Sequence, residues 1–134
     1  MTQWHNIVIR STPRARLEAE ARIMEAVTSN GFSPDACFYV KLAMEEAVVN
    51  AIKHGNRLDA SKRVHLRYAC DHDRFMLSVR DEGDGFDPSK VPDPTAPENL
   101  ALPYGRGLML MKSYMDSVEW SKNGREVTLV KLNR

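Results

Sequence analysis

The sequence predicts an α+β two-layer sandwich, in which a mixed, mostly antiparallel sheet carries helices packed on one face. Two amphipathic helical segments follow one another near the N-terminus, and short alternating segments further along are joined in pairs by turn residues. The predicted order is strand, helix, helix, strand, strand, long loop, helix, strand, strand. A chain of 134 residues fits one domain of common size, so we expect a single domain over residues 1–134.

Composition and charge exclude several classes of protein. Nineteen basic and eighteen acidic residues give a formal charge of +1, so charge offers no argument for nucleic acid or an anionic membrane as partner. No stretch approaches the ~18 consecutive apolar residues that span a bilayer, and the N-terminus lacks the pattern of a signal peptide. Cys37 and Cys70 show no metal-binding spacing. We therefore expect a cytoplasmic protein with two reduced thiols and with neither nucleic acid nor membrane as a direct partner.

The first strand and the first helix are predicted from local signals. Residues 4–10 read as a short strand, and Thr12-Pro13 then provides a cap and a residue suited to the first helical position. Residues 13–29 read as an amphipathic helix that ends at Asn30-Gly31. Its expected buried stripe has steps of three and four: Leu17, Ala21, Met24 and Val27.

The second helix repeats the same start signal. Ser33 can cap it, Pro34 fits the first position, and Asp35 favours the positive end of the helix. We expect this helix to run to about His54, with Gly55 as its terminator. Its expected buried stripe is Cys37, Val40, Met44, Ala47 and Ala51.

Two hairpins are predicted in the rest of the chain. Residues 62–70 and 74–80 alternate in polarity around the loop Asp71-His72-Asp73, with Val64, Leu66, Tyr68, Cys70, Phe75, Leu77 and Val79 facing the core. The second hairpin joins residues 117–122 and 126–132 through the two-residue turn signal Asn123-Gly124.

A long loop and a short helix separate the two hairpins. Residues 84–104 hold five prolines and little periodicity, which is typical of a functional lid or of disorder. Gly105-Arg106-Gly107 then opens a short apolar helix, Leu108 to Met115.

Glu46, Asn50 and His54 recur at four-residue spacing on the second helix, away from its apolar stripe. The carboxylate can take a proton from a hydroxyl, and the amide oxygen is a suitable ligand for Mg²⁺ that also binds phosphates. The spacing alone favours an ordinary solvated helix face, because such polar stripes are common.

The segment Asp81-Glu82-Gly83-Asp84-Gly85-Phe86 follows directly on a predicted strand. Glycines allow the backbone to approach a flat ligand closely, and a carboxylate at a strand end can accept a hydrogen bond from the amino group of adenine. A surface turn is the alternative, because Asp-Gly pairs are frequent in turns.

Gly105-Arg106-Gly107-Leu108 combines glycines with a helix start. Free backbone N–H groups and the positive helix end make such a start a phosphate site, to which Arg106 could add charge. A flexible hinge before the helix is the alternative interpretation.

Taken in order, the three motifs resemble the GHKL ATP-binding (Bergerat) fold of histidine kinases, gyrase, Hsp90 and MutL. The match is closest to the anti-sigma factor/serine-protein kinases, the RsbW- and SpoIIAB-like branch, and covers nearly the whole chain. Residues 43–55 look like the N-box of that branch, residues 81–86 like its G1 box, and residues 105–108 like its G2 box.

The resemblance implies a role for each matching residue. Asn50 would ligate Mg²⁺ that bridges the ATP phosphates, and Glu46 would be the catalytic base. Asp81 would hold the adenine amino group. His54, Gly55, Gly83 and Gly85 would line the nucleotide pocket. Roughly residues 86–104 would form a mobile ATP lid. At its end, the phosphates would be contacted by Gly105, Arg106, Gly107 and Leu108.

The resemblance also implies a function and partners. The chain would be a cytoplasmic serine-protein kinase that phosphorylates a STAS-type anti-sigma factor antagonist and restrains a sigma factor, and a homodimer is a further implication. Two other hypotheses stay open. One is a nucleotide-gated binding module without phosphotransfer. The other is the catalytic piece of a histidine kinase, although no helical hairpin with a phosphoacceptor histidine precedes the domain in this sequence.

Overall fold

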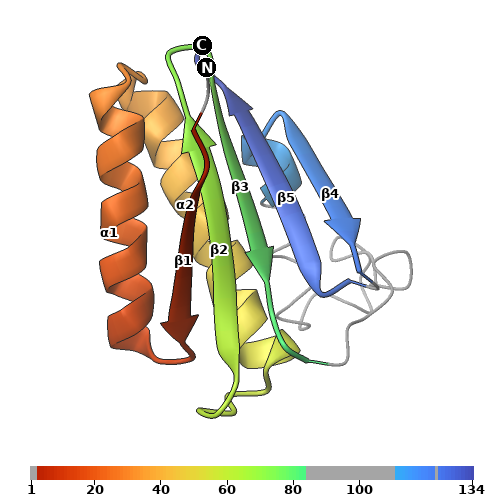
Figure 1. The fold of residues 1–134 in the computed structure, drawn as a ribbon. Coiled ribbons are helices and arrows are strands. Elements are labelled where there is room, and N and C mark those ends of the chain that lie inside the picture. The colour runs from red at the N-terminus through yellow and green to blue at the C-terminus, as the bar shows by residue number, and fades with distance from the viewer. Residues whose placement is uncertain (1–2, 84–110, 123) are drawn as a thin grey trace.

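The computed structural model describes residues 3–83, 111–122 and 124–134. Within these ranges the sheet has five strands in the order β1-β2-β3-β5-β4, and each described pairing is antiparallel. Figure 1 shows two layers, with α1 and α2 on one face of the sheet. The elements are β1 (His5–Arg10), α1 (Pro13–Ser29), α2 (Pro34–Asn50), the π-helical turn η1 (Ala51–Gly55), β2 (Arg63–Cys70), β3 (Arg74–Arg80), β4 (Ser117–Ser121) and β5 (Glu126–Leu132). The predicted fold class is confirmed.

Both helices begin at the predicted caps. The Thr12 hydroxyl accepts a hydrogen bond from the backbone N–H of Ala15, and the Ser33 hydroxyl accepts one from that of Ala36. Each bond satisfies one of the free N–H groups that a helix start leaves without an intrahelical partner. Thr12 and Ser33 therefore set where α1 and α2 begin.

The predicted buried stripe of α1 is wrong in part. Leu17 is 57% exposed and Ala21 is also exposed, whereas Ile23 and Val27 are fully buried. The helix packs through a different stripe, which includes Ala19 and Glu20. Sequence periodicity could not separate these two stripes, because apolar residues recur at helical spacing on both.

The stripe predicted for α2 is confirmed except at Cys37, which is only half-buried. Val40, Met44, Ala47 and Ala51 all lie in the core. This helix contacts β3 and β5, whereas α1 contacts β1 and β2. The C-terminal end of α2 therefore comes to lie behind the middle of the sheet (Figure 1).

The inward faces of the strands form a continuous apolar layer. The register places Tyr68 opposite Leu77, Leu77 opposite Leu129, and Leu129 opposite Val118, so one row crosses four strands. The first three of these side chains are at most 5% exposed. The alternation predicted for the strands is confirmed, although Cys70 at the end of β2 is only half-buried.

The two hairpin loops differ from one another. The first forms as predicted, because the Asp71 carboxylate accepts hydrogen bonds from the backbone N–H groups of Asp73 and Arg74. The second is longer than predicted, since the last paired residues of its two strands are Ser121 and Glu126. Lys122 and Gly124 both have positive φ, of 54° and 82°. Two left-handed positions allow the longer loop to turn back on itself.

Some predictions fall partly or wholly outside the described residues. The proline-rich loop at 84–104 lies outside them. Of the helix predicted for residues 108–115, the structure describes a helical segment at 111–114, and Met111 and Met115 are buried in the core. No helix in the described ranges is long and apolar enough to cross a membrane.

Candidate functional site

Two of the predicted site residues lie on the last turns of α2. Glu46 and Asn50 are both half-buried, next to the fully buried Met44 and Val48. A rise of about 1.5 Å per residue places the two side chains one helical turn apart, on the order of 6 Å along the axis. A carboxylate and an amide therefore line up at the border between the core and the solvent.

The helix does not continue in α form to His54 as predicted. The last turn, Ala51–Gly55, is π-helical, and the backbone N–H of Asn56 donates to the carbonyl of Ala51, five residues earlier. A π turn holds more residues than an α turn, so His54 does not complete the predicted four-residue repeat after Asn50. His54 is exposed. Single π turns occur frequently at functional sites.

The Asp81–Gly83 turn lies at the end of β3 and is held firmly. The Asp81 backbone N–H donates to the carbonyl of Arg125, at 2.9 Å, and its Oδ1 accepts from the N–H of Gly83, at 2.8 Å. The side chain is buried. Desolvation by burial raises the pKa of Asp81, and the bond from Gly83 and the nearby Arg125 and Lys62 oppose only part of that shift.

The structure brings the end of the helical motif and the Asp81 turn into direct contact. A Cβ atom placed on Gly55 would collide with the carboxylate of Asp81, and one placed on Gly83 would collide with the carbonyl oxygen of Gly55. Only glycines allow so close an approach. Gly55, Asp81 and Gly83 therefore form one compact corner. Asn50 and Glu46 lie one and two helical turns before this corner, on α2.

Sequence reasoning missed a buried residue beside this corner. Asn56 is 0% exposed, and its side chain is bonded to Ser11, Arg63 and Glu82. An asparagine just after a helix-ending glycine is common at helix ends, so no local signal marks it as unusual. Its partners lie up to 45 residues away in the chain.

The remaining predicted site residues lie outside the described part of the chain. They are Gly85, Gly105, Arg106, Gly107 and Leu108, together with the proposed lid at 86–104. Among the described residues, no group of three or more His, Cys, Asp or Glu side chains gathers to hold a metal ion. Of the predicted site residues that the structure describes, Glu46 and Asn50 are the two on α2, one helical turn apart.

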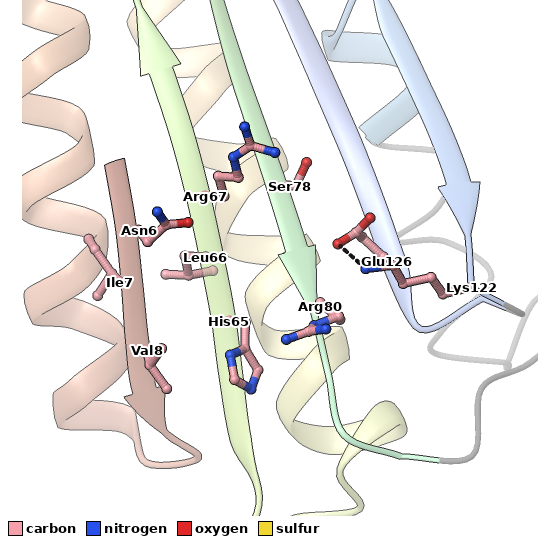
Figure 2. Close-up of a pocket in the computed structure, with 10 residues that line it drawn as sticks. All are labelled: Asn6, Ile7, Val8, His65, Leu66, Arg67, Ser78, Arg80, Lys122 and Glu126. Carbon is pink, nitrogen blue, oxygen red and sulfur yellow. Dashed lines mark ion pairs between the residues drawn. The ribbon is translucent and has the colours of Figure 1, made fainter. Parts of the chain in front are cut away.

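A hollow on the opposite face of the sheet is separate from this corner. It is lined by basic and polar side chains of the strands, among them His65, Arg67 and Arg80 (Figure 2). These residues alternate along the strands with core residues such as Val64 and Val79, and therefore point away from the helices. None of the predicted site residues lines this hollow.

Comparison with known proteins finds relatives in the family that the sequence motifs resemble. The model of the histidine kinase-like ATPase domain matches residues 9–131. A Bacillus licheniformis protein named "Serine-protein kinase RsbW" is 35% identical over 112 residues, which cover 78% of this chain and 70% of that protein. An Oceanobacillus iheyensis protein named "Anti-sigma F factor" is 31% identical over 107 residues, covering 76% and 73%.

A solved structure is also similar in fold. It contains the RsbU and RsbW domains of a Mycobacterium tuberculosis protein and superposes with a TM-score of 0.66 at 18% identity. The match covers 99% of the present chain and 32% of the other one. At this identity the likeness shows the fold alone, which agrees with the two-layer arrangement in Figure 1.

Proposed function

Because the chain belongs to the histidine kinase-like ATPase domain family, we propose that it is an ATP-dependent serine-protein kinase and an anti-sigma factor. In this role it transfers the γ-phosphoryl group of ATP to a serine of a STAS-type anti-sigma factor antagonist and sequesters a sigma factor. The relatives named serine-protein kinase and anti-sigma F factor support this proposal. We further propose that residues 1–134 are a single cytoplasmic domain that forms a homodimer.

The contact between Gly55 and Asp81 is the observation that carries the proposal. It joins the end of η1 to the turn after β3 across a corner that only glycines can form. Asp81 would accept a hydrogen bond from the adenine amino group at this corner. Asn50 lies further back along α2, where the phosphates of the same nucleotide would reach it. One ligand could thus contact both motifs.

Glu46 and Asn50 suit the chemistry of phosphoryl transfer. The Asn50 amide oxygen and the phosphates together offer the oxygen ligands that Mg²⁺ prefers, so the donor set fits this ion. Bound Mg²⁺ would supply charge neutralisation on the phosphates. Glu46, one turn before Asn50, would accept the proton of the partner's serine hydroxyl as its oxygen bonds the γ-phosphorus. The bond from that phosphorus to the β,γ-bridging oxygen breaks, and ADP leaves.

His54, which is described and exposed, and several residues outside the described part of the chain complete the proposal. His54 and Gly85 would line the pocket around the base. Residues 86–104 would form the lid, and Gly105, Arg106, Gly107 and Leu108 would contact the phosphates at its end. Free N–H groups at a helix start and an arginine are suited to anionic groups.

Nucleotide binding is tested by titration calorimetry with Mg-ATP. We expect wild-type protein to bind and Asn50→Ala to lose binding, because the substitution removes the oxygen that would hold Mg²⁺. Asn6→Ala is the matched control, since Asn6 is exposed on the opposite face of the sheet. Absence of binding by the wild-type protein would exclude both the kinase and the nucleotide-gated binding module.

Phosphotransfer is tested with ATP labelled at the γ-phosphate and a STAS-type partner protein. Label on a partner serine that withstands denaturing electrophoresis supports the kinase. ATP-dependent complex formation without label would replace the kinase by a nucleotide-gated binding module of the same fold. Co-purification of a sigma factor with the wild-type protein tests the anti-sigma role, and failure of every sigma factor of the host to bind would exclude that role.

A further inference from the structure

Asn56 links its own segment to three others at the edge of the proposed nucleotide site. It follows Gly55 and is fully buried. Its Nδ2 donates to the Ser11 hydroxyl at 3.1 Å and to the Arg63 carbonyl at 2.9 Å. Its Oδ1 accepts from the backbone N–H of Glu82 at 2.7 Å. The amide therefore uses both of its donor hydrogens and its acceptor oxygen on protein partners.

The bond to Glu82 bears directly on Asp81. The N–H of Glu82 belongs to the peptide group that follows the Asp81 Cα atom, so this bond fixes the backbone on the C-terminal side of Asp81. The Asp81 N–H, on the other side, is held by the carbonyl of Arg125. The carboxylate that would meet adenine is thus anchored from two directions, one of which is Asn56.

A second pair of contacts supports the same connection. The Glu82 carboxylate accepts a hydrogen bond from the Arg63 backbone N–H at 2.7 Å and contacts His65 Nε2 at 2.8 Å. Arg63 and Glu82 are exposed and His65 is half-buried, whereas the Asn56 side chain is fully buried, so water screens its hydrogen bonds less. Asn56 is therefore the interior member of the connection between β2 and the Asp81 turn.

We propose that Asn56 is a positioning residue that holds Asp81 in the position where its carboxylate binds the adenine amino group. This inference rests on the proposed function, because it assumes a nucleotide at the Gly55–Asp81 corner. It predicts that Asn56 acts on recognition of the base, through Asp81, and leaves contacts with the phosphates largely unaffected. A role limited to stabilising the fold would weaken all nucleotides equally.

The test compares two nucleotides that differ at one group. Mg-ATP carries the 6-amino group, and Mg–purine riboside triphosphate lacks it. Asn56→Ala should weaken the binding of ATP by about tenfold and that of the purine analogue by less than about twofold, as expected for one displaced hydrogen-bond partner. On an Asp81→Asn background, Asn56→Ala should add less than about twofold, because the two residues act on the same contact.

Ser11→Ala is the matched control within the same network. It removes the hydroxyl that bonds to Asn56 and to the carbonyl of Lys62, but leaves the bond between Asn56 and Glu82. It should lower the midpoint of thermal unfolding and preserve the ratio of the two nucleotide affinities. Asn56→Asp keeps an acceptor oxygen for the Glu82 N–H, and should therefore preserve that ratio better than Asn56→Ala.

Three results would overturn the inference. One is an equal loss of affinity for both nucleotides in Asn56→Ala, and another is full additivity with Asp81→Asn. If Asn56→Ala does not fold, Asn56→Ser takes its place. The third result is then an unchanged ratio of the affinities for ATP and the purine analogue in Asn56→Ser. A wild-type protein that binds neither nucleotide would refute the proposed function itself, whereas normal wild-type binding with unaffected Asn56 variants would refute only this inference.

Discussion

The backbone of Gly83 lies directly against the carbonyl oxygen of Gly55, closely enough that a Cβ atom on Gly83 could not fit between them. The two glycines belong to different layers, one at the end of the helical segment and the other just after β3. Their contact determines how near the helix end can come to Asp81. The shape of the proposed base pocket therefore depends on the absence of side chains at two positions.

Gly83→Ala is expected to destabilise the protein by about 1–3 kcal/mol, as overpacking does, and to weaken ATP binding strongly. The added methyl group meets a backbone oxygen, which cannot turn aside as a flexible side chain could. Urea unfolding and calorimetry with Mg-ATP measure the two effects.

Gly31→Ala is the control for that substitution. Gly31 has a φ of 80° and open space around its Cα, so an alanine there is strained by backbone conformation alone. It should cost about 1 kcal/mol without changing the affinity for ATP. Unchanged ATP binding by Gly83→Ala would contradict the pocket that we place at this corner.

Glu46→Gln should preserve ATP binding and lower phosphotransfer to a partner serine by about 10²–10⁴-fold, the usual contribution of a general base. Glu45→Gln is a close control, because Glu45 is the neighbouring half-buried residue of α2 and its side chain lies 4.0 Å from Arg16. Rates of label transfer at saturating ATP distinguish the two variants. Equal rates for wild type and Glu46→Gln would remove Glu46 from the role of base.

Asp81→Asn should stabilise the protein without nucleotide while weakening ATP binding. Burial raises the pKa of Asp81 in the folded state above its ordinary value of 3.8, so the folded protein holds this proton more tightly than the unfolded chain. The carboxyl group consequently lowers the free energy of unfolding as pH rises from about 4 through the raised pKa. The stability gain of Asp81→Asn should therefore be small at pH 3 and largest near neutrality.

Urea unfolding of both proteins across pH 3–8 measures this difference. Asp73→Asn serves as a control at an exposed position. A stability gain that is constant across the pH range would show that burial of the Asp81 charge is not its cause.

The parts of the fold that were predicted correctly depend on local signals. Ser33, Pro34 and the apolar stripe of α2 lie within one segment, and they predicted both where the helix begins and which side it buries. The strand faces followed in the same way from alternation. The Glu46–Asn50 pair could be placed on one helix because both residues precede the π turn.

The parts that were missed depend on contacts between distant segments. Leu17 is as apolar as Ile23, and only the packing of α1 on β1 and β2 decides which one is buried. The π turn lets Asn56 enter the interior, where its partners lie 45, 26 and 7 residues away. No short sequence window contains that information, so the residue that anchors the Asp81 turn could not be found without the structure.

Asp116→Ala should lower the free energy of unfolding by about 1–3 kcal/mol, because it leaves a buried cation without its counterion. Lys131 is 6% exposed, and its Nζ lies 3.3 Å from Asp116 Oδ2. The same oxygen accepts a hydrogen bond from the backbone N–H of Leu132 at 2.7 Å. Thus one carboxylate both compensates the buried charge and holds the end of β5.

The loss should depend on pH. Burial alone would raise the pKa of Asp116, but the bonds from Leu132, Arg134 and Lys131 outweigh it and lower that pKa from 3.8 to about 2. The stabilisation is therefore complete above about pH 4 and is lost as pH falls towards 2. Urea unfolding at pH 7 and at pH 2.5 should show a large difference between wild type and Asp116→Ala only at the higher pH. Glu119→Ala, at an exposed position of β4, which begins directly after Asp116, should show little difference at either pH. An equal loss for both variants at pH 7 would mean that the Asp116–Lys131 pair has no special role.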